Sequence, residues 1–189
     1  MRETDPGILV GEKHNPVGRY VHGPRDHSFR YSMRRDYFTL ELADIGWVDD
    51  EGDPAVPTIM IDFIGPTDDI TNRLTTSTGE YLSDSETDVA LRLQSDIEKS
   101  DAMGVVSVTN RSTGEYIVEL NETVSTVMEF IKAVRRYEEY DDSKNGRYRI
   151  KIAANGEDLV SYEKSTLLVY NHEGELLRRH SIIPSGIEL

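Results

Sequence analysis

The chain has 189 residues, with 21 Lys and Arg against 35 Asp and Glu and a formal net charge of −14 at pH 7. It contains no cysteine, which excludes disulfides, thiolate catalysis and cysteine-ligated metal centres. The acidic balance argues against a broad nucleic-acid surface, and no apolar run approaches the ~18 residues of a membrane-spanning helix, so we expect a cytoplasmic protein with no membrane contact.

The first 32 residues differ from the rest in charge and in pattern. They carry five cations and four acidic side chains, a net charge of +1, whereas residues 33–189 carry the other 16 cations and 31 acidic side chains, a net charge of −15. Proline and glycine interrupt the segment, which shows no helical or strand periodicity. We expect an irregular or disordered N-terminal extension over residues 1–32, either a start-site artefact upstream of Met33 or a mobile arm rich in His and Arg, followed by one acidic domain over residues 33–189.

From Met33 onward the sequence is mainly of strand type. In the first strand Phe38, Leu40 and Leu42 share one face, and the same period-two alternation recurs along the chain. It predicts strands at Tyr37 to Leu42, Thr58 to Ile64, Thr87 to Gln94, Val105 to Thr109, Glu115 to Leu120, Arg147 to Ala153, Leu159 to Tyr162, Thr166 to Tyr170 and Glu175 to Ile183. The fourth and fifth of these flank a loop that ends near a glycine, which predicts an antiparallel hairpin.

Helical periodicity is clearest between Asn121 and Tyr140. Apolar side chains recur there at steps of three and four residues, with Asn121 as the expected N-cap and Arg135 and Arg136 near the C-terminal end. A shorter helix at Asp68 to Leu74, capped by Thr67, also fits the sequence. We predict an α+β fold: a mainly antiparallel sheet of about seven to nine strands with one long helix, at about residues 122–139, packed on it.

One pentapeptide, Ser-Thr-Gly-Glu-Tyr, occurs at residues 77–81 and again at residues 112–116. A duplicated unit would explain it, but the flanking sequences do not match. Repeated turn chemistry is the better interpretation.

Four segments together resemble a family of uncharacterised haloarchaeal proteins. The segments are Met33 to Glu41, Pro57 to Phe63, Asp88 to Gln94 and Gly104 to Arg111, and the resemblance covers about Met33 to Tyr137. It implies a high-salt environment and a natural start at Met33, and it assigns no activity and no site residue. The composition agrees, since carboxylates keep a protein hydrated in molar salt while their repulsion is screened.

Cations are scarce here, so a local group of them is informative. Arg147, Arg149 and Lys151 share one face of a predicted strand, and cationic side chains also end the long helix and lie on the last strand. If they converge, they form a site that binds an anion or a partner; the alternative is ion pairing with neighbouring Glu. The candidate set is Arg135, Arg136, Arg147, Arg149, Lys151, Arg178 and Arg179.

Acidic residues at the end of one apolar strand form a second candidate. Asp62 lies within the strand, and Asp68 and Asp69 follow it. Carboxylate oxygens suit Mg²⁺ or Ca²⁺, so these three residues are the candidate metal ligands; the alternative is an outward-facing or salt-bridged Asp62. The dense acidic loop at residues 49–53 lacks the spacing of a calcium loop.

No set of convergent reactive groups appears in the sequence, and it contains no nucleophile elbow, Walker loop or His-Glu-x-x-His motif. We therefore expect a non-catalytic binding, regulatory or assembly module that needs no cofactor and acts with a protein partner or as a homo-oligomer. The alternatives are an enzyme that uses carboxylates and a divalent cation, and a protein that binds an anion or nucleotide through its Arg clusters.

Overall fold

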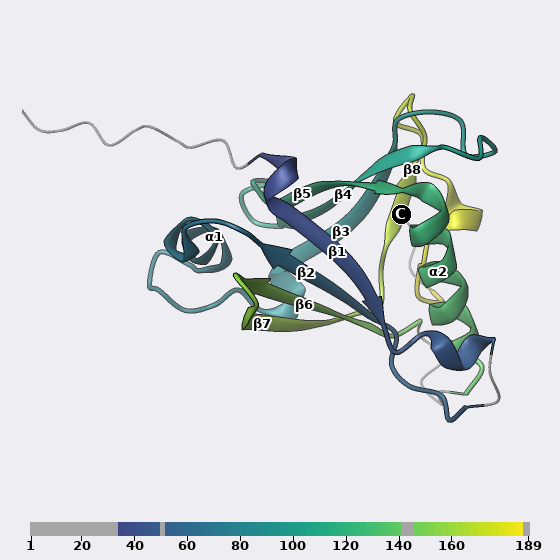
Figure 1. The fold of residues 1–189 in the computed structure, drawn as a ribbon, viewed down its shortest axis with the longest axis horizontal. Helices are drawn as coiled ribbons and strands as arrows, with labels where there is room; N and C mark the ends of the chain where they lie inside the picture. Colours follow the sequence, from purple (N-terminus) through teal and green to yellow (C-terminus); the bar gives the residue numbers. More distant parts are fainter. Residues whose placement is uncertain (1–33, 50–51, 141–145, 187–189) are drawn as a thin grey trace, which may run out of the picture. The chain divides into compact units, whose positions relative to one another are not determined.

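The computed structural model describes residues 34–49, 52–140 and 146–186; the predicted N-terminal extension lies outside these residues. The described part forms two four-stranded sheets, ordered β1-β2-β6-β7 and β5-β4-β3-β8, and two α-helices (Figure 1). The α+β class is confirmed. The strands are β1 (Phe38–Ala43), β2 (Thr58–Phe63), β3 (Thr87–Leu93), β4 (Met103–Asn110), β5 (Tyr116–Thr123), β6 (Tyr148–Ala154), β7 (Glu157–Lys164) and β8 (Leu168–Tyr170), and the helices are α1 (Thr67–Leu74) and α2 (Val124–Glu138).

The prediction of a single sheet of about seven to nine strands with one long helix is wrong. Alternating side chains on both sheets contribute to one hydrophobic cluster, which includes Ile61 and Ile150 from the first sheet and Leu91 and Val118 from the second. Each sheet therefore helps to bury the apolar face of the other. The long helix is therefore not the main cover of a single sheet, contrary to the prediction.

Most strand pairs are antiparallel, as predicted. The β4 and β5 strands form the expected hairpin, whereas β2 pairs with β6 and β3 pairs with β8 in parallel. Both parallel pairs join strands that are distant in the sequence, because a parallel pair needs a long crossover connection.

The long helix α2 begins later than predicted. Asn121 belongs to β5, and the N-cap is Thr123, whose side chain accepts a hydrogen bond from the backbone N–H of Thr126. The apolar stripe of α2 is buried, and the ring of Phe130 packs edge-on against that of Tyr148 in β6, with centroids 5.4 Å apart. This ring contact links the helix to the first sheet.

The shorter helix α1 closes another part of the core. Its Ile70 and Leu74 are fully buried, four residues apart on one face. Its N-cap is Pro66, and Thr67 lies inside the helix rather than capping it.

The prediction of a last strand at Glu175 to Ile183 is wrong. Only single bridges form there, at Leu176 and Ile182, and the chain between them contains the 3₁₀ helix η4 (Arg178–His180). The cause lies in α2: the Nη2 of Arg135 donates hydrogen bonds to the carbonyl oxygens of Arg179 and Ser181. These carbonyls are therefore satisfied by a side chain and not by a neighbouring strand.

Both copies of the repeated pentapeptide form turns. Gly79 and Gly114 have φ of +84° and +72°, a conformation in which glycine lacks the steric penalty of other residues. The N–H of Gly79 donates to the carbonyl of Thr76, and the N–H of Gly114 donates to that of Asn110. Repeated turn chemistry therefore accounts for the repeat.

Candidate functional site

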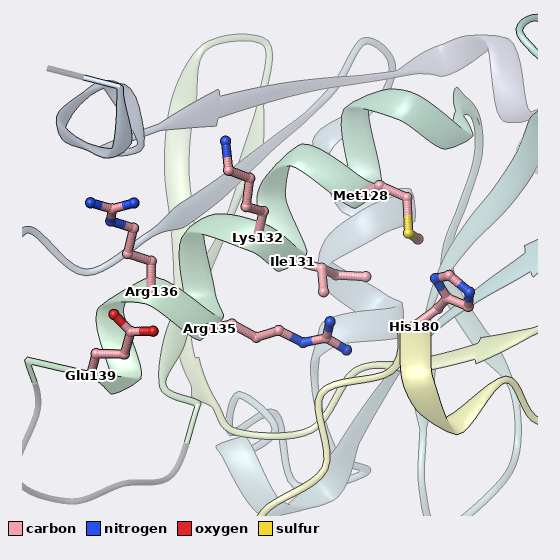
Figure 2. Close-up of a pocket in the computed structure, with 7 residues that line it drawn as sticks. All are labelled: Met128, Ile131, Lys132, Arg135, Arg136, Glu139 and His180. Atoms are coloured by element: carbon pink, nitrogen blue, oxygen red, sulfur yellow. The ribbon is translucent and has the colours of Figure 1, made fainter.

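A groove between α2 and η4 gathers cationic and apolar side chains. It has a volume of about 330 Å³ and is lined by Met128, Ile131, Lys132, Arg135, Arg136, Glu139 and His180 (Figure 2). Five of these residues come from α2, Glu139 is the C-cap of that helix, and His180 comes from η4. The groove thus combines three cationic side chains with an apolar floor.

Within the groove the side chains divide into an inner wall and an outer edge. Figure 2 shows Met128, Ile131 and Arg135 extending toward His180, while Lys132 and Arg136 extend from the other side of the helix. Ile131 is buried, Met128 and His180 are half-buried, and Lys132 and Arg136 are exposed. The apolar floor therefore lies inside, and the cations at the outer edge are accessible to solvent.

Arg135 holds the two walls of the groove together. Its Nη2 donates to the carbonyl oxygens of Arg179 and Ser181, the latter at 3.1 Å. On the far side of η4 the hydroxyl of Ser181 donates to the carbonyl of Leu177 and accepts from the N–H of Val169. Arg135 therefore has a structural role, positioning η4 and His180 against α2.

Lys132 has an internal partner. Its Nζ lies 3.5 Å from Oδ1 of Asp49, and both side chains are largely exposed. The segment before Asp49 is fixed on α2 by Trp47, whose ring packs edge-on against Tyr137 and Tyr140 with centroids 6.3 and 5.9 Å apart. An exposed ion pair of this kind contributes only about 0 to 1 kcal/mol, so an anionic ligand can compete with Asp49 for the Lys132 ammonium.

The predicted cation cluster is divided between two surfaces. Arg135 and Arg136 line the groove, and Arg178 and Arg179 are exposed on η4 next to it. Arg149 lies on β6 and forms a cross-strand ion pair with Glu163 of β7, with Nη2 and Oε1 3.3 Å apart.

The remaining predicted cations do not line the groove. Lys151 lies opposite Met60 of β2 and Ser161 of β7, and Arg147 immediately precedes β6; both are half-buried. Of the two interpretations of these cations, ion pairing with a neighbouring Glu is the one that the structure shows for Arg149.

The three candidate metal ligands do not converge. Asp62 accepts a hydrogen bond from the backbone N–H of Gly156, with a distance of 3.0 Å, so its carboxylate holds the turn between β6 and β7. Asp68 and Asp69 lie in the first turn of α1, where acidic side chains stabilise a helix. Among residues 34–49, 52–140 and 146–186, no group of three or more His, Cys, Asp or Glu side chains is arranged to hold a metal ion.

Five residues that line the groove were not predicted as site residues: Met128, Ile131, Lys132, Glu139 and His180. The available signal was the step of four residues from Lys132 to Arg136, which places two cations on one side of a helix. No sequence signal places His180 beside them, because that contact depends on the hydrogen bonds of Arg135.

Ionisable groups with shifted pKa values lie away from this groove, near the end of β7. Burial raises the pKa of the Tyr162 phenol, and the carboxylates of Asp84 and Glu86 act in the same direction. Burial lowers the pKa of Lys164, whose Nζ donates to the carbonyl oxygens of Asp84 and Thr87. The pKa of Glu86 is lowered by hydrogen bonds from Ser83. Lys164 thus links the end of β7, in the first sheet, to the start of β3, in the second sheet.

Tyr148 and Tyr162 form a contrasting pair. Both side chains are about 1% exposed or less. The Tyr148 hydroxyl donates to the carbonyl of Thr166 at 2.7 Å, whereas the Tyr162 hydroxyl has no hydrogen-bond partner among the described residues. Burial raises the pKa of Tyr148 well above its ordinary value.

No helix in the described ranges is long and apolar enough to cross a membrane. The model of a family of unknown function (DUF5793) matches residues 33–189. No curated protein and no solved structure matches the chain.

Proposed function

We propose that this chain, which belongs to the DUF5793 family of unknown function, is a non-catalytic binding module whose groove between α2 and η4 holds an anionic group of a partner. The observation that carries the proposal is the gathering of Lys132, Arg135 and Arg136 over Met128 and Ile131 in one groove. Cations are the minority charge in this chain, so their concentration on one short stretch of helix is a local exception to its acidic character.

The cations of the groove also have a structural explanation. Cations in the last turn of a helix interact favourably with its C-terminal dipole, and α2 has Arg135 and Arg136 there. That explanation accounts for Arg136 and, together with the hydrogen bonds to η4, for Arg135. It does not account for the half-buried Met128 and His180 beside them, which leave apolar and imidazole surface available to a ligand.

The environment we propose is a cytoplasm of high salt, as in the haloarchaeal proteins that the sequence resembles. The net charge of −15 on residues 33–189 and the low share of lysine, 6 of the 21 cations, support it. Self-repulsion at this charge density is screened in molar salt and strengthens as salt is diluted. Thermal unfolding followed by circular dichroism should therefore show a midpoint that falls as salt is lowered from about 2 M to about 0.1 M; an unchanged midpoint would remove this proposal.

The alternative of an enzyme that uses carboxylates and a divalent cation has less support. Asp62 is engaged with Gly156, and the first turn of α1 accounts for Asp68 and Asp69. The binding of an anion by the Arg cluster, in contrast, is part of the function proposed here, with Arg149 left out because it is paired with Glu163.

The test is equilibrium binding of anionic probes to the full chain and to two matched variants. The groove variant is Lys132→Ser with Arg136→Ser, which spares Arg135 and its hydrogen bonds. The control is Arg92→Ser with Lys99→Ser, which removes two exposed cations outside the groove and so changes the net charge equally. Polyglutamate and tripolyphosphate are the probes. We expect the groove variant to bind at least one of them about five- to tenfold more weakly than the control; equal binding by both variants would refute the groove as the site.

A further inference from the structure

We propose that the ligand of the groove between α2 and η4 is an acidic peptide segment of a partner protein, in which carboxylate side chains alternate with apolar ones. This inference rests on the proposed function and specifies its ligand. It depends on three features of the groove: its apolar floor, the arrangement of its cations and the presence of Glu139.

The floor requires apolar atoms in the ligand. Met128 is half-buried and extends toward His180 inside the groove, beside the buried Ile131 (Figure 2). A purely charged ligand would leave the exposed part of Met128 without an apolar contact. Methionine is flexible and adapts to varied apolar side chains, which is why it is common on surfaces that bind peptides. A peptide supplies such side chains, whereas inorganic phosphate and a bare sugar–phosphate backbone do not.

The cations are arranged for a chain and not for one compact anion. Lys132 and Arg136 are separated by one helical turn, a rise of about 6 Å, and Arg135 already donates to the carbonyls of Arg179 and Ser181. In an extended peptide, alternate side chains point the same way and lie about 6.6 Å apart. Two carboxylates two residues apart therefore match the spacing of Lys132 and Arg136, while the residues between them face the opposite side.

Two further features disfavour phosphate. Compact anions are bound best at helix N-termini, where free N–H groups and the positive end of the dipole face the ligand, but the groove lies along the C-terminal half of α2. Glu139 adds a negative charge at its end. A peptide can tolerate Glu139, since its backbone N–H groups are hydrogen-bond donors.

The proposed high-salt environment also favours a ligand with apolar side chains. In molar salt the Debye length is about 3 Å, so attraction between exposed charges is weak. Apolar contacts are not screened in this way. A ligand that is retained in such an environment must therefore gain part of its affinity from the floor, which again favours a segment with apolar side chains between its carboxylates.

The experiment compares four probes on the full chain at about 0.15 M and about 2 M KCl by isothermal titration calorimetry. The first is an eight-residue peptide of alternating Glu and Leu. In the second Gln replaces Glu, in the third Ser replaces Leu, and the fourth probe is tripolyphosphate. We expect the first peptide to bind at least tenfold more tightly than the other three. Its affinity should fall at least fivefold in the Lys132→Ser, Arg136→Ser variant and stay unchanged in the Arg92→Ser, Lys99→Ser control.

The outcomes separate this inference from the proposed function. Tighter groove-dependent binding of tripolyphosphate, or equal binding of the peptides with and without Leu, would overturn the peptide ligand and leave an anion site in place. Equal binding of the Gln peptide would show that the carboxylates are not recognised. If no probe distinguishes the groove variant from its control, both the ligand and the site are refuted.

Discussion

The guanidinium of Arg135 donates through one nitrogen, Nη2, to the carbonyl oxygen of Arg179 and also to that of Ser181. This contact joins α2 to η4 and thereby creates the groove. In Arg135→Met the apolar stem is kept and the donors are lost, so we expect η4 to detach locally while the core stays folded. Hydrogen–deuterium exchange should accelerate at His180 and Ser181, whose N–H groups donate to Leu177 and Arg178, with little change in β4 and β5.

The control for this prediction is Arg136→Met on the neighbouring position, which removes the same charge without removing the hydrogen bonds to η4. Its exchange pattern should match that of the unmodified chain. If Arg135→Met also leaves η4 protected, apolar packing and not Arg135 holds the segment.

The two buried tyrosines should respond in opposite ways to loss of the hydroxyl. Tyr148→Phe removes the donor to Thr166 and leaves a carbonyl without its partner, at a cost of about 1 kcal/mol or more in the free energy of unfolding. Tyr162→Phe removes a buried hydroxyl that has no partner among the described residues, so it should leave stability unchanged or raise it by up to about 1 kcal/mol. Urea unfolding at constant high salt measures both values; a large loss for Tyr162→Phe would reveal a hydrogen bond to an ordered water.

The same tyrosines predict sensitivity to alkali. The folded-state pKa of each phenol is raised above its ordinary value of 10.0 by burial, so below pH 10 their contribution to stability is complete. Above pH 10 the unfolded chain releases these protons and the folded chain retains them, so the free energy of unfolding falls with increasing pH, by at most about 1.4 kcal/mol per pH unit for each tyrosine. Urea unfolding at a series of pH values should show a shallower fall in Tyr162→Phe.

Lys164 changes the free energy of unfolding with pH in the opposite direction. Its folded-state pKa is lowered from 10.5, mainly by burial, so between the folded and the unfolded pKa the unfolded chain binds more protons and stability rises with pH. At pH values below 10.5 this rise in the free energy of unfolding should therefore be smaller or absent in a Lys164→Met variant. An identical rise in the variant and in the unmodified chain over this range would contradict the assignment.

Sequence periodicity predicted most individual strands because alternation is a local property. Phe38, Ile61 and Ile150 are buried where it placed them. It could not show which strands share a sheet, since two sheets that cover each other have the same alternation as one sheet covered by a helix. The prediction of a strand at Glu175 to Ile183 is wrong for a related reason. The hydrogen bonds of Arg135 to this segment come from a helix that is distant in the sequence.

The candidate site was predicted in part. Arg135, Arg136, Arg178 and Arg179 were identified as cations that could converge, and the structure places the first two in the groove with the others beside it. Arg149 was included because it shares one face of a predicted strand with Arg147 and Lys151, but it pairs with Glu163 across the first sheet. Whether a cation lines a groove or pairs across a sheet depends on the packing of elements, which local spacing does not encode.

The ion pair between Asp49 and Lys132 predicts a variant that binds more tightly. Asp49→Asn removes the internal competitor for the Lys132 ammonium, so the peptide of alternating Glu and Leu should bind up to about fivefold more tightly, the equivalent of an exposed pair worth up to about 1 kcal/mol. Calorimetry at about 0.15 M salt, where the pair is least screened, gives the clearest comparison. Asp44→Asn, at another exposed position before Trp47, is the control; equal gains in both variants would mean that net charge alone is responsible.

The most direct test of the groove as the binding site is amide NMR of the full chain titrated with the peptide of alternating Glu and Leu. We expect the largest shift changes at residues 128–139, in α2 and its C-cap, and at His180. The indole signal of Trp47, the only tryptophan in the chain, should shift as Asp49 is displaced. The outer face of β6, with Arg149 and Lys151, should stay unchanged. Shift changes centred on β6, or none at any residue at millimolar peptide, would contradict the groove as the binding site.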